Sequence, residues 1–124
     1  MIGAIALGGA LGALLRFGIS MAALALFADW AVAGTLTANV AGSFVIGLVA
    51  AWVVRRGVSI EREAFLVTGF CGGFTTFSAF SLETVMMIVG GNWAGAGLYV
   101  LVSVPLWLGA AWAGWSTGEV FAGR

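Results

Sequence analysis

The sequence contains no lysine and no histidine, and it has one cysteine and one proline among 124 residues. Without histidine, and with Cys71 as the only thiol, zinc binding, haem ligation and imidazole acid–base chemistry are disfavoured. A lone cysteine also excludes a disulfide within the chain. Catalysis would need a nucleophile–base pair or a metal-ligand set, and neither is evident. The sequence therefore predicts a protein that is not an enzyme.

Charge is scarce. Charged residues make up 8% of the chain, whereas soluble domains carry about 25%. Five arginines balance five acidic residues, so there is no basic face for nucleic acid. Hydrophobic residues make up 62% of the chain. This composition is typical of a membrane protein, and the length fits one domain over residues 1–124.

Four apolar segments are long enough for the roughly 20 residues that a helix needs to cross a bilayer. They cover approximately residues 2–28, 32–54, 64–89 and 94–116. The breaks between them are at Asp29-Trp30, residues 55–63 and residues 90–93. We therefore expect an all-α membrane protein with four transmembrane helices in contact with lipid.

Arginines are concentrated on one side of this arrangement. Arg55, Arg56 and Arg62 lie in the second break, and four spans would put Arg124 and both termini on the same side. The opposite side has no loop arginine. Cytoplasmic segments carry the excess of arginine and lysine, so this distribution favours cytoplasmic termini.

The third apolar segment contains GFCGGFTTFSAFSLE at positions 69–83. We expect the helix to break at Gly72-Gly73, in the middle of the membrane, because glycine leaves helical geometry readily. Thr75, Thr76 and Ser78 supply hydroxyls that can cap a helix that restarts there. Backbone groups freed at this depth must be buried in protein or line a cavity, and in broken membrane helices they bind ions. The segment therefore predicts an ion site.

Beyond the break, one helical face combines aromatic rings with hydroxyls. It carries Phe77, Phe80, Ser81 and Thr84 at helical spacing. Two phenylalanines usually indicate packing, but hydroxyls are unexpected on a lipid-facing surface, and ring edges can stabilise an anion. Glu83 lies about one turn after Phe80. It could pair with an arginine, line a vestibule or carry a proton.

Polar residues also occur inside the other spans. Arg16 should face a partner or water, although it could also snorkel to the surface. Asn39 could join helices together or, beside a broken helix, donate its NH₂ to an anion. Tyr99 and Ser103 lie one turn apart. They could form a track of hydroxyls or ordinary interhelical hydrogen bonds.

Small residues recur at intervals of four in two spans. Gly8 and Gly12 are so spaced in the first, and Gly34, Ala38 and Gly42 in the second. Such faces let membrane helices approach closely. Four helices without long loops have little room to enclose a pathway, so we expect a second copy of the chain to complete it.

Taken together, these motifs resemble the fluoride-channel family called Fluc or CrcB. The resemblance is carried by GGALGALLR at 8–16, GTLTANVAGSF at 34–44 and, most specifically, the block at 69–83. It implies a passive channel in the bacterial inner (plasma) membrane that exports fluoride and so reduces fluoride toxicity. It also implies a dual-topology homodimer of two antiparallel copies, or a pair of homologous chains in opposite orientations.

The resemblance further implies a structural sodium ion at the dimer centre, held by the backbone carbonyls of Gly72 and Thr75. Arg16 and Glu83 would be structural or vestibule residues. The candidate residues of the fluoride pathway are Asn39, Phe77, Phe80, Ser81, Thr84, Tyr99 and Ser103.

This sequence departs from the family pattern at two positions. Ala79 stands where many members have a threonine, which removes one hydroxyl. Trp107 stands one turn after Ser103, where a further hydroxyl can occur in relatives. The hydroxyl track is therefore expected to end early, at Ser103.

The main alternative is a small proton-coupled exporter of organic cations, of the four-helix dimeric type. Such an exporter needs an acidic residue in its first span, but that span carries Arg16, and Glu83 lies late in the third. A second alternative is a scaffold subunit that transports nothing. It would explain the small-residue faces but not a broken helix with aligned phenylalanines and hydroxyls.

Overall fold

The computed structural model describes residues 1–28, 30 and 32–123, so Asp29 of the expected first break and Arg124 of the arginine distribution lie outside the described residues. The described chain is helical throughout, with short connections. Its helices are α1 (Ile2–Leu26), α2 (Val32–Arg56), α3 (Ile60–Glu63), the π-helical η1 (Ala64–Cys71), α4 (Gly72–Phe74), α5 (Phe77–Val89) and α6 (Trp93–Ala122).

Four helical segments of the described chain are long and apolar enough to cross a membrane: α1, α2, the composite segment Ile60–Val89 and α6. The protein is therefore a multi-pass, all-α membrane protein. The composite segment begins at Ile60 rather than near residue 64, because Ser59 caps it by accepting a hydrogen bond from the Arg62 N–H. At the other end of the chain, α6 continues beyond residue 116 to Ala122.

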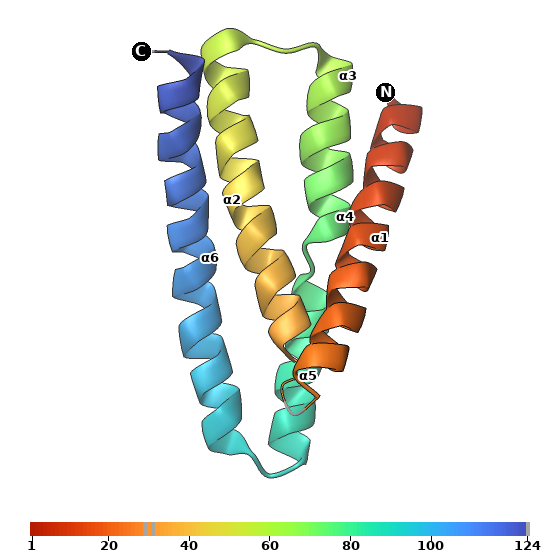
Figure 1. Ribbon diagram of the computed structural model, residues 1–124, viewed down its shortest axis with the longest axis vertical. Helices are drawn as coiled ribbons and strands as arrows, with labels where there is room; N and C mark the ends of the chain where they lie inside the picture. The colour runs from red at the N-terminus through yellow and green to blue at the C-terminus, as the bar shows by residue number, and fades with distance from the viewer. Residues whose placement is uncertain (29, 31, 124) are drawn as a thin grey trace.

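The four segments alternate in direction (Figure 1). Both ends of the described chain and the connection from α2 to α3 lie at one end of the molecule, and the turn between α5 and α6 lies at the other. Helices α2 and α6 run parallel, side by side, and form the most extensive helix pair. Arg55, at the end of α2, forms an ion pair of 2.6 Å with Glu119 of α6. The termini therefore share an end of the molecule with the arginines of the α2–α3 connection.

Glycines allow α1 to lie directly on the first half of the third span. A Cβ atom at Gly8 would meet the Phe65 carbonyl oxygen, and one at Gly12 would meet that of Phe70. On α2, Ala38 is fully buried and Gly42 faces the Thr75 side chain. Both expected small-residue faces therefore pack within a single chain.

The third span is broken, but the expected position of the break, Gly72-Gly73, is wrong. These residues are helical, and the backbone becomes extended at Thr75 (ψ 155°) and Thr76 (ψ 119°). Gly73 serves close packing instead, since a Cβ atom there would meet the Gly9 carbonyl oxygen. β-Branched threonine is well suited to extended backbone. The Thr76 hydroxyl accepts a hydrogen bond of 3.2 Å from the Ala79 N–H, which confirms that a threonine caps the restarted helix.

Candidate functional site

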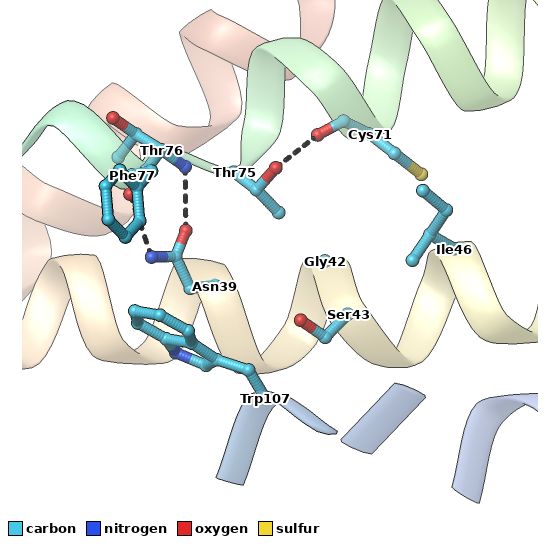
Figure 2. A pocket seen from close by; sticks show the side chains of 9 residues that line it. All are labelled: Asn39, Gly42, Ser43, Ile46, Cys71, Thr75, Thr76, Phe77 and Trp107. Carbon is cyan, nitrogen blue, oxygen red and sulfur yellow. Dashed lines mark hydrogen bonds between the residues drawn. The ribbon is translucent and has the colours of Figure 1, made fainter. Parts of the chain in front are cut away.

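Asn39 of α2 holds the break in place (Figure 2). Its Oδ1 accepts a hydrogen bond of 2.7 Å from the Thr76 N–H, and its Nδ2 donates one of 2.9 Å to the Thr76 carbonyl. A carboxamide matches a peptide group in this way because it donates and accepts at once. Asn39 is buried, so these bonds satisfy two backbone groups that the broken helix leaves open deep in the protein. The second hydrogen on Nδ2 is not used by this pair.

Arg16 of α1 supports the first half of the broken span. Its Nε donates a hydrogen bond of 3.2 Å to the Gly73 carbonyl, close to the end of α4. A cation at the C-terminal end of a helix complements the negative end of the helix dipole. The structure therefore gives Arg16 a partner within the chain, as expected for an arginine placed inside a span.

The carbonyls of residues 72–75 lose the donors that an unbroken helix would give them, and those of Gly72 and Thr75 are two of these. The N–H of Thr76 would bond to the Gly72 carbonyl, but it is bound to Asn39. The N–H of Ala79 would bond to the Thr75 carbonyl, but it is bound to the Thr76 hydroxyl. The break therefore leaves the carbonyls of Gly72 and Thr75, which the family resemblance implies as sodium ligands, without their helical donors, and it does the same to the carbonyl of Phe74.

Beyond the break, Phe80 is the centre of an aromatic cluster. Its ring centroid lies 5.7 Å from that of Phe77, 5.0 Å from that of Tyr99 and 4.8 Å from that of Trp107. The Trp107 contact is T-shaped. Phe80 is buried, whereas Phe77 is 71% exposed in the single chain. The structure thus brings together three residues predicted for the pathway and adds Trp107.

Glu83 is bound by hydroxyls rather than by an arginine. Thr35 of α2 donates to Oε1 and Tyr99 of α6 donates to Oε2, each at 2.6 Å. The carboxylate therefore links three helices at one end of the aromatic cluster. Thr35 was not predicted as a site residue, although its position one turn before Asn39, on the same face of α2, was a usable signal.

The remaining predicted hydroxyls divide into two kinds. Ser81 donates to the Phe77 carbonyl at 2.9 Å and Thr84 donates to the Phe80 carbonyl at 2.8 Å, so both bond to the preceding turn of α5. Their hydrogens do not face another helix. Ser103, in contrast, is completely buried on α6, and its Oγ has no hydrogen-bond partner among the described residues.

A cavity of about 210 Å³ lies beside the break. It is bordered by α2, the broken segment and α6 and is open to the surface of the single chain, and Figure 2 shows Trp107 extending from α6 on the side where Asn39 binds Thr76. The residues that line it are Asn39, Gly42, Ser43, Ile46, Cys71, Thr75, Thr76, Phe77 and Trp107. Polar groups from α2 and the break thus share one cavity with two aromatic side chains.

The chain matches a family model described as "CrcB-like protein, Camphor Resistance (CrcB)" over residues 3–115. The protein belongs to the CrcB family. A CrcB-family relative from Hyphomonas neptunium is 47% identical over 124 residues, which cover 95% of each chain. One from Rhizobium etli is 44% identical over 111 residues and 89% of each chain, and one from Paramagnetospirillum magneticum is 45% identical over 113 residues, 89% of this chain and 88% of its own.

Each of these CrcB-family relatives bears the name "Fluoride-specific ion channel FluC". They cover nearly the whole chain, including both halves of the broken span. The resemblance found in the sequence motifs is therefore confirmed. The prediction that the chain is not an enzyme is confirmed as well, because the relatives are named ion channels.

Proposed function

We propose that this CrcB-family protein is a fluoride-selective passive channel that exports fluoride from the cytoplasm and so reduces its toxicity. The names of its relatives support this function over nearly the full length of the chain. The observation that carries the proposal is the cavity at the break. It has an amide and two threonines on one side, and it borders the aromatic cluster through Phe77 and Trp107.

The chemistry of this cavity suits a small, strongly hydrated anion. Fluoride must exchange its water for other donors, and the unused N–H of Asn39, hydroxyls and ring edges can replace part of that shell. None of these groups carries a full positive charge, so a bound ion can still leave, as conduction requires. The charged Arg16 is engaged by the Gly73 carbonyl instead.

A second copy in the opposite orientation completes the proposed channel. The single chain leaves Phe77 71% exposed and Gly72 exposed at the edge of the break. A partner packed against this edge would cover both. A homologous chain in the opposite orientation would serve equally, and the proposed location is the bacterial inner membrane.

Sodium fits the freed carbonyls at the break. Hard cations prefer oxygen ligands, and backbone carbonyls at breaks in membrane helices coordinate sodium. The Gly72 and Thr75 carbonyls have lost their helical donors. We propose that they hold a structural sodium ion with the same groups of the second copy. The ion would supply positive charge that holds the two breaks together.

Sodium is expected to stabilise the dimer without being transported. Replacing potassium with sodium should raise the midpoint of thermal unfolding of the purified protein by roughly 5 °C, because sodium would bind only the folded dimer. Fluorescence-detected size exclusion after heating measures this shift. An identical midpoint in both salts, or fluoride flux driven by a sodium gradient, would contradict a structural role.

The proposed function is tested by fluoride efflux from liposomes that contain the purified chain, with chloride measured in parallel and protein-free liposomes as the control. Rapid fluoride release without chloride release is expected, with no requirement for a proton gradient. Release that depends on a proton gradient would instead favour the exporter. No release from one chain, followed by release when a homologous chain is added, would identify an opposed hetero-pair.

A further inference from the structure

Among the arginines that the structure describes, Arg62 differs from the others. The guanidinium groups of Arg16, Arg55 and Arg56 each bind an oxygen elsewhere in the chain. Arg62 makes a hydrogen bond through its backbone N–H, and its guanidinium has no partner among the described residues. A guanidinium offers five donors in a planar fork that matches the oxygens of a phosphate or carboxylate. The Arg62 side chain is therefore available to an external anion.

Arg62 lines a second cavity, of about 460 Å³, at the end of the molecule that carries the α2–α3 connection (Figure 1). The other residues around it are Trp52, Ser59, Glu61, Phe65 and Leu66. The cavity is open to the surface, and its size falls within the roughly 300–1,000 Å³ typical of small-molecule sites. It shares no residue with the cavity at the break. It is therefore a separate candidate site.

The wall of this cavity changes from charged to apolar over one helical turn. Glu61 and Arg62 lie at the start of the composite span, and Phe65 and Leu66 follow one turn further into it. Trp52 lies one turn before the end of α2, at a level where interfacial tryptophans are typical, and it is 37% exposed. The cavity therefore crosses the level at which bilayer headgroups meet hydrocarbon. A molecule that fits it is charged at one end and apolar at the other.

The two charged residues define the headgroup of that molecule. Arg62 supplies a cation that suits a phosphate, and Glu61 supplies a carboxylate that suits an ammonium. The Glu61 Oε1 lies 3.9 Å from the N-terminal amine of Met1, but both side chains are mostly exposed, so this ion pair is weak. A carboxylate also has a second oxygen that can accept hydrogen bonds. One positive and one negative side chain on the same cavity complement a zwitterion better than an anion.

We propose that this cavity binds a zwitterionic phospholipid with a primary ammonium, such as phosphatidylethanolamine. The phosphate binds the Arg62 guanidinium and the ammonium binds Glu61. The acyl chains lie against Phe65 and Leu66, and Trp52 borders the headgroup. The proposal does not depend on the ion that the protein conducts, because the cavity lies apart from the break.

Native mass spectrometry tests the site on purified, delipidated protein mixed with equal amounts of phosphatidylethanolamine and phosphatidylglycerol. The wild type should retain phosphatidylethanolamine preferentially, and Arg62→Gln should lower its binding roughly tenfold, as expected when a hydrogen bond to a charged group is lost. The matched control is Glu63→Gln, since Glu63 is exposed on the same helix but does not line the cavity. It should bind lipid like the wild type. Equal retention by the wild type and a correctly eluting Arg62→Gln would overturn the site.

Glu61→Gln tests the ammonium contact. It should abolish the preference for phosphatidylethanolamine over phosphatidylglycerol, because both lipids carry the phosphate and only the first carries the ammonium. Phosphatidylcholine, whose quaternary ammonium has no N–H, should bind the wild type more weakly than phosphatidylethanolamine. A wild-type preference for phosphatidylglycerol, or an unchanged preference in Glu61→Gln, would overturn the zwitterionic ligand.

Soluble phosphoethanolamine separates a lipid from a free phosphate compound. It has the same charged groups but no acyl chains to contact Phe65 and Leu66. At equal concentration it should leave phosphatidylethanolamine bound to the wild type. Displacement of the lipid would show that the cavity recognises the charged groups alone, and would overturn the lipid as its ligand.

Discussion

Replacing Asn39 with aspartate is expected to abolish most fluoride efflux, by about a hundredfold, because the change disrupts the break and adds a negative charge to the cavity. The Nδ2 donor would become an oxygen facing the Thr76 carbonyl, across a contact that is now 2.9 Å. Two acceptors at that distance repel each other, and Asn39 is only 5% exposed. The measurement is fluoride efflux from liposomes.

Asn92 offers a matched control. Its Oδ1 accepts a hydrogen bond from the Gly95 N–H at the start of α6, and it lies in an exposed turn. Aspartate is an equally good cap, so Asn92→Asp should conduct like the wild type. Both variants must elute as intact protein in size exclusion. Undiminished efflux from correctly assembled Asn39→Asp would show that Asn39 neither shapes nor lines the pathway.

The class of fold could be predicted from composition and segment length alone. Four apolar segments within 124 residues, almost without charge, leave few alternatives to a small bundle of membrane helices. The helix ends were harder to predict from the sequence, because terminal residues such as Arg62 and Glu119 are polar yet remain helical at the ends of the bundle. Their capping and ion-pair partners became visible only in three dimensions.

The position of the break shows where local propensity fails. Glycine is the poorest helix former after proline, so the sequence predicted the helix break at Gly72-Gly73. In the structure both glycines are helical, α1 lies against Gly73, and the extended residues are Thr75 and Thr76. What decides the position is the Asn39 amide, which replaces the helical hydrogen bonds at Thr76. A single sequence does not reveal which peptide a distant side chain will bind.

The residue types of the candidate site could be predicted from the sequence. The hydrogen bonds and contacts that join these residues could not. The spacing of Phe77 and Phe80 and the isolated Asn39 stood out in the sequence. The binding of Glu83 by Thr35 and Tyr99 depends on three helices that converge from distant parts of the chain. Likewise, Trp107 looked like a departure that ends the track, whereas the structure places it against the same cavity as Asn39.

Phe77→Ile is expected to reduce fluoride efflux about a hundredfold while leaving the proposed dimer assembled, because it removes an aromatic edge from the proposed pathway. Phe77 lines the cavity at the break and contacts Phe80, yet 71% of it is exposed in the single chain. The substitution therefore takes little from the packing of one chain. Fluoride efflux from liposomes, together with size exclusion of the same preparation, measures both properties.

The matched control for Phe77 is Leu82→Ile, on the same helix and 63% exposed, which should conduct normally. The comparison separates an aromatic requirement from a general sensitivity of α5. A Phe77→Ile protein that assembles and conducts at the wild-type rate would remove the aromatic ring from the mechanism. A variant that elutes as a monomer would instead place Phe77 in the dimer contact. Loss of flux in an intact dimer would show that the ring edge acts on the ion itself, because a polarised aromatic edge is what isoleucine lacks.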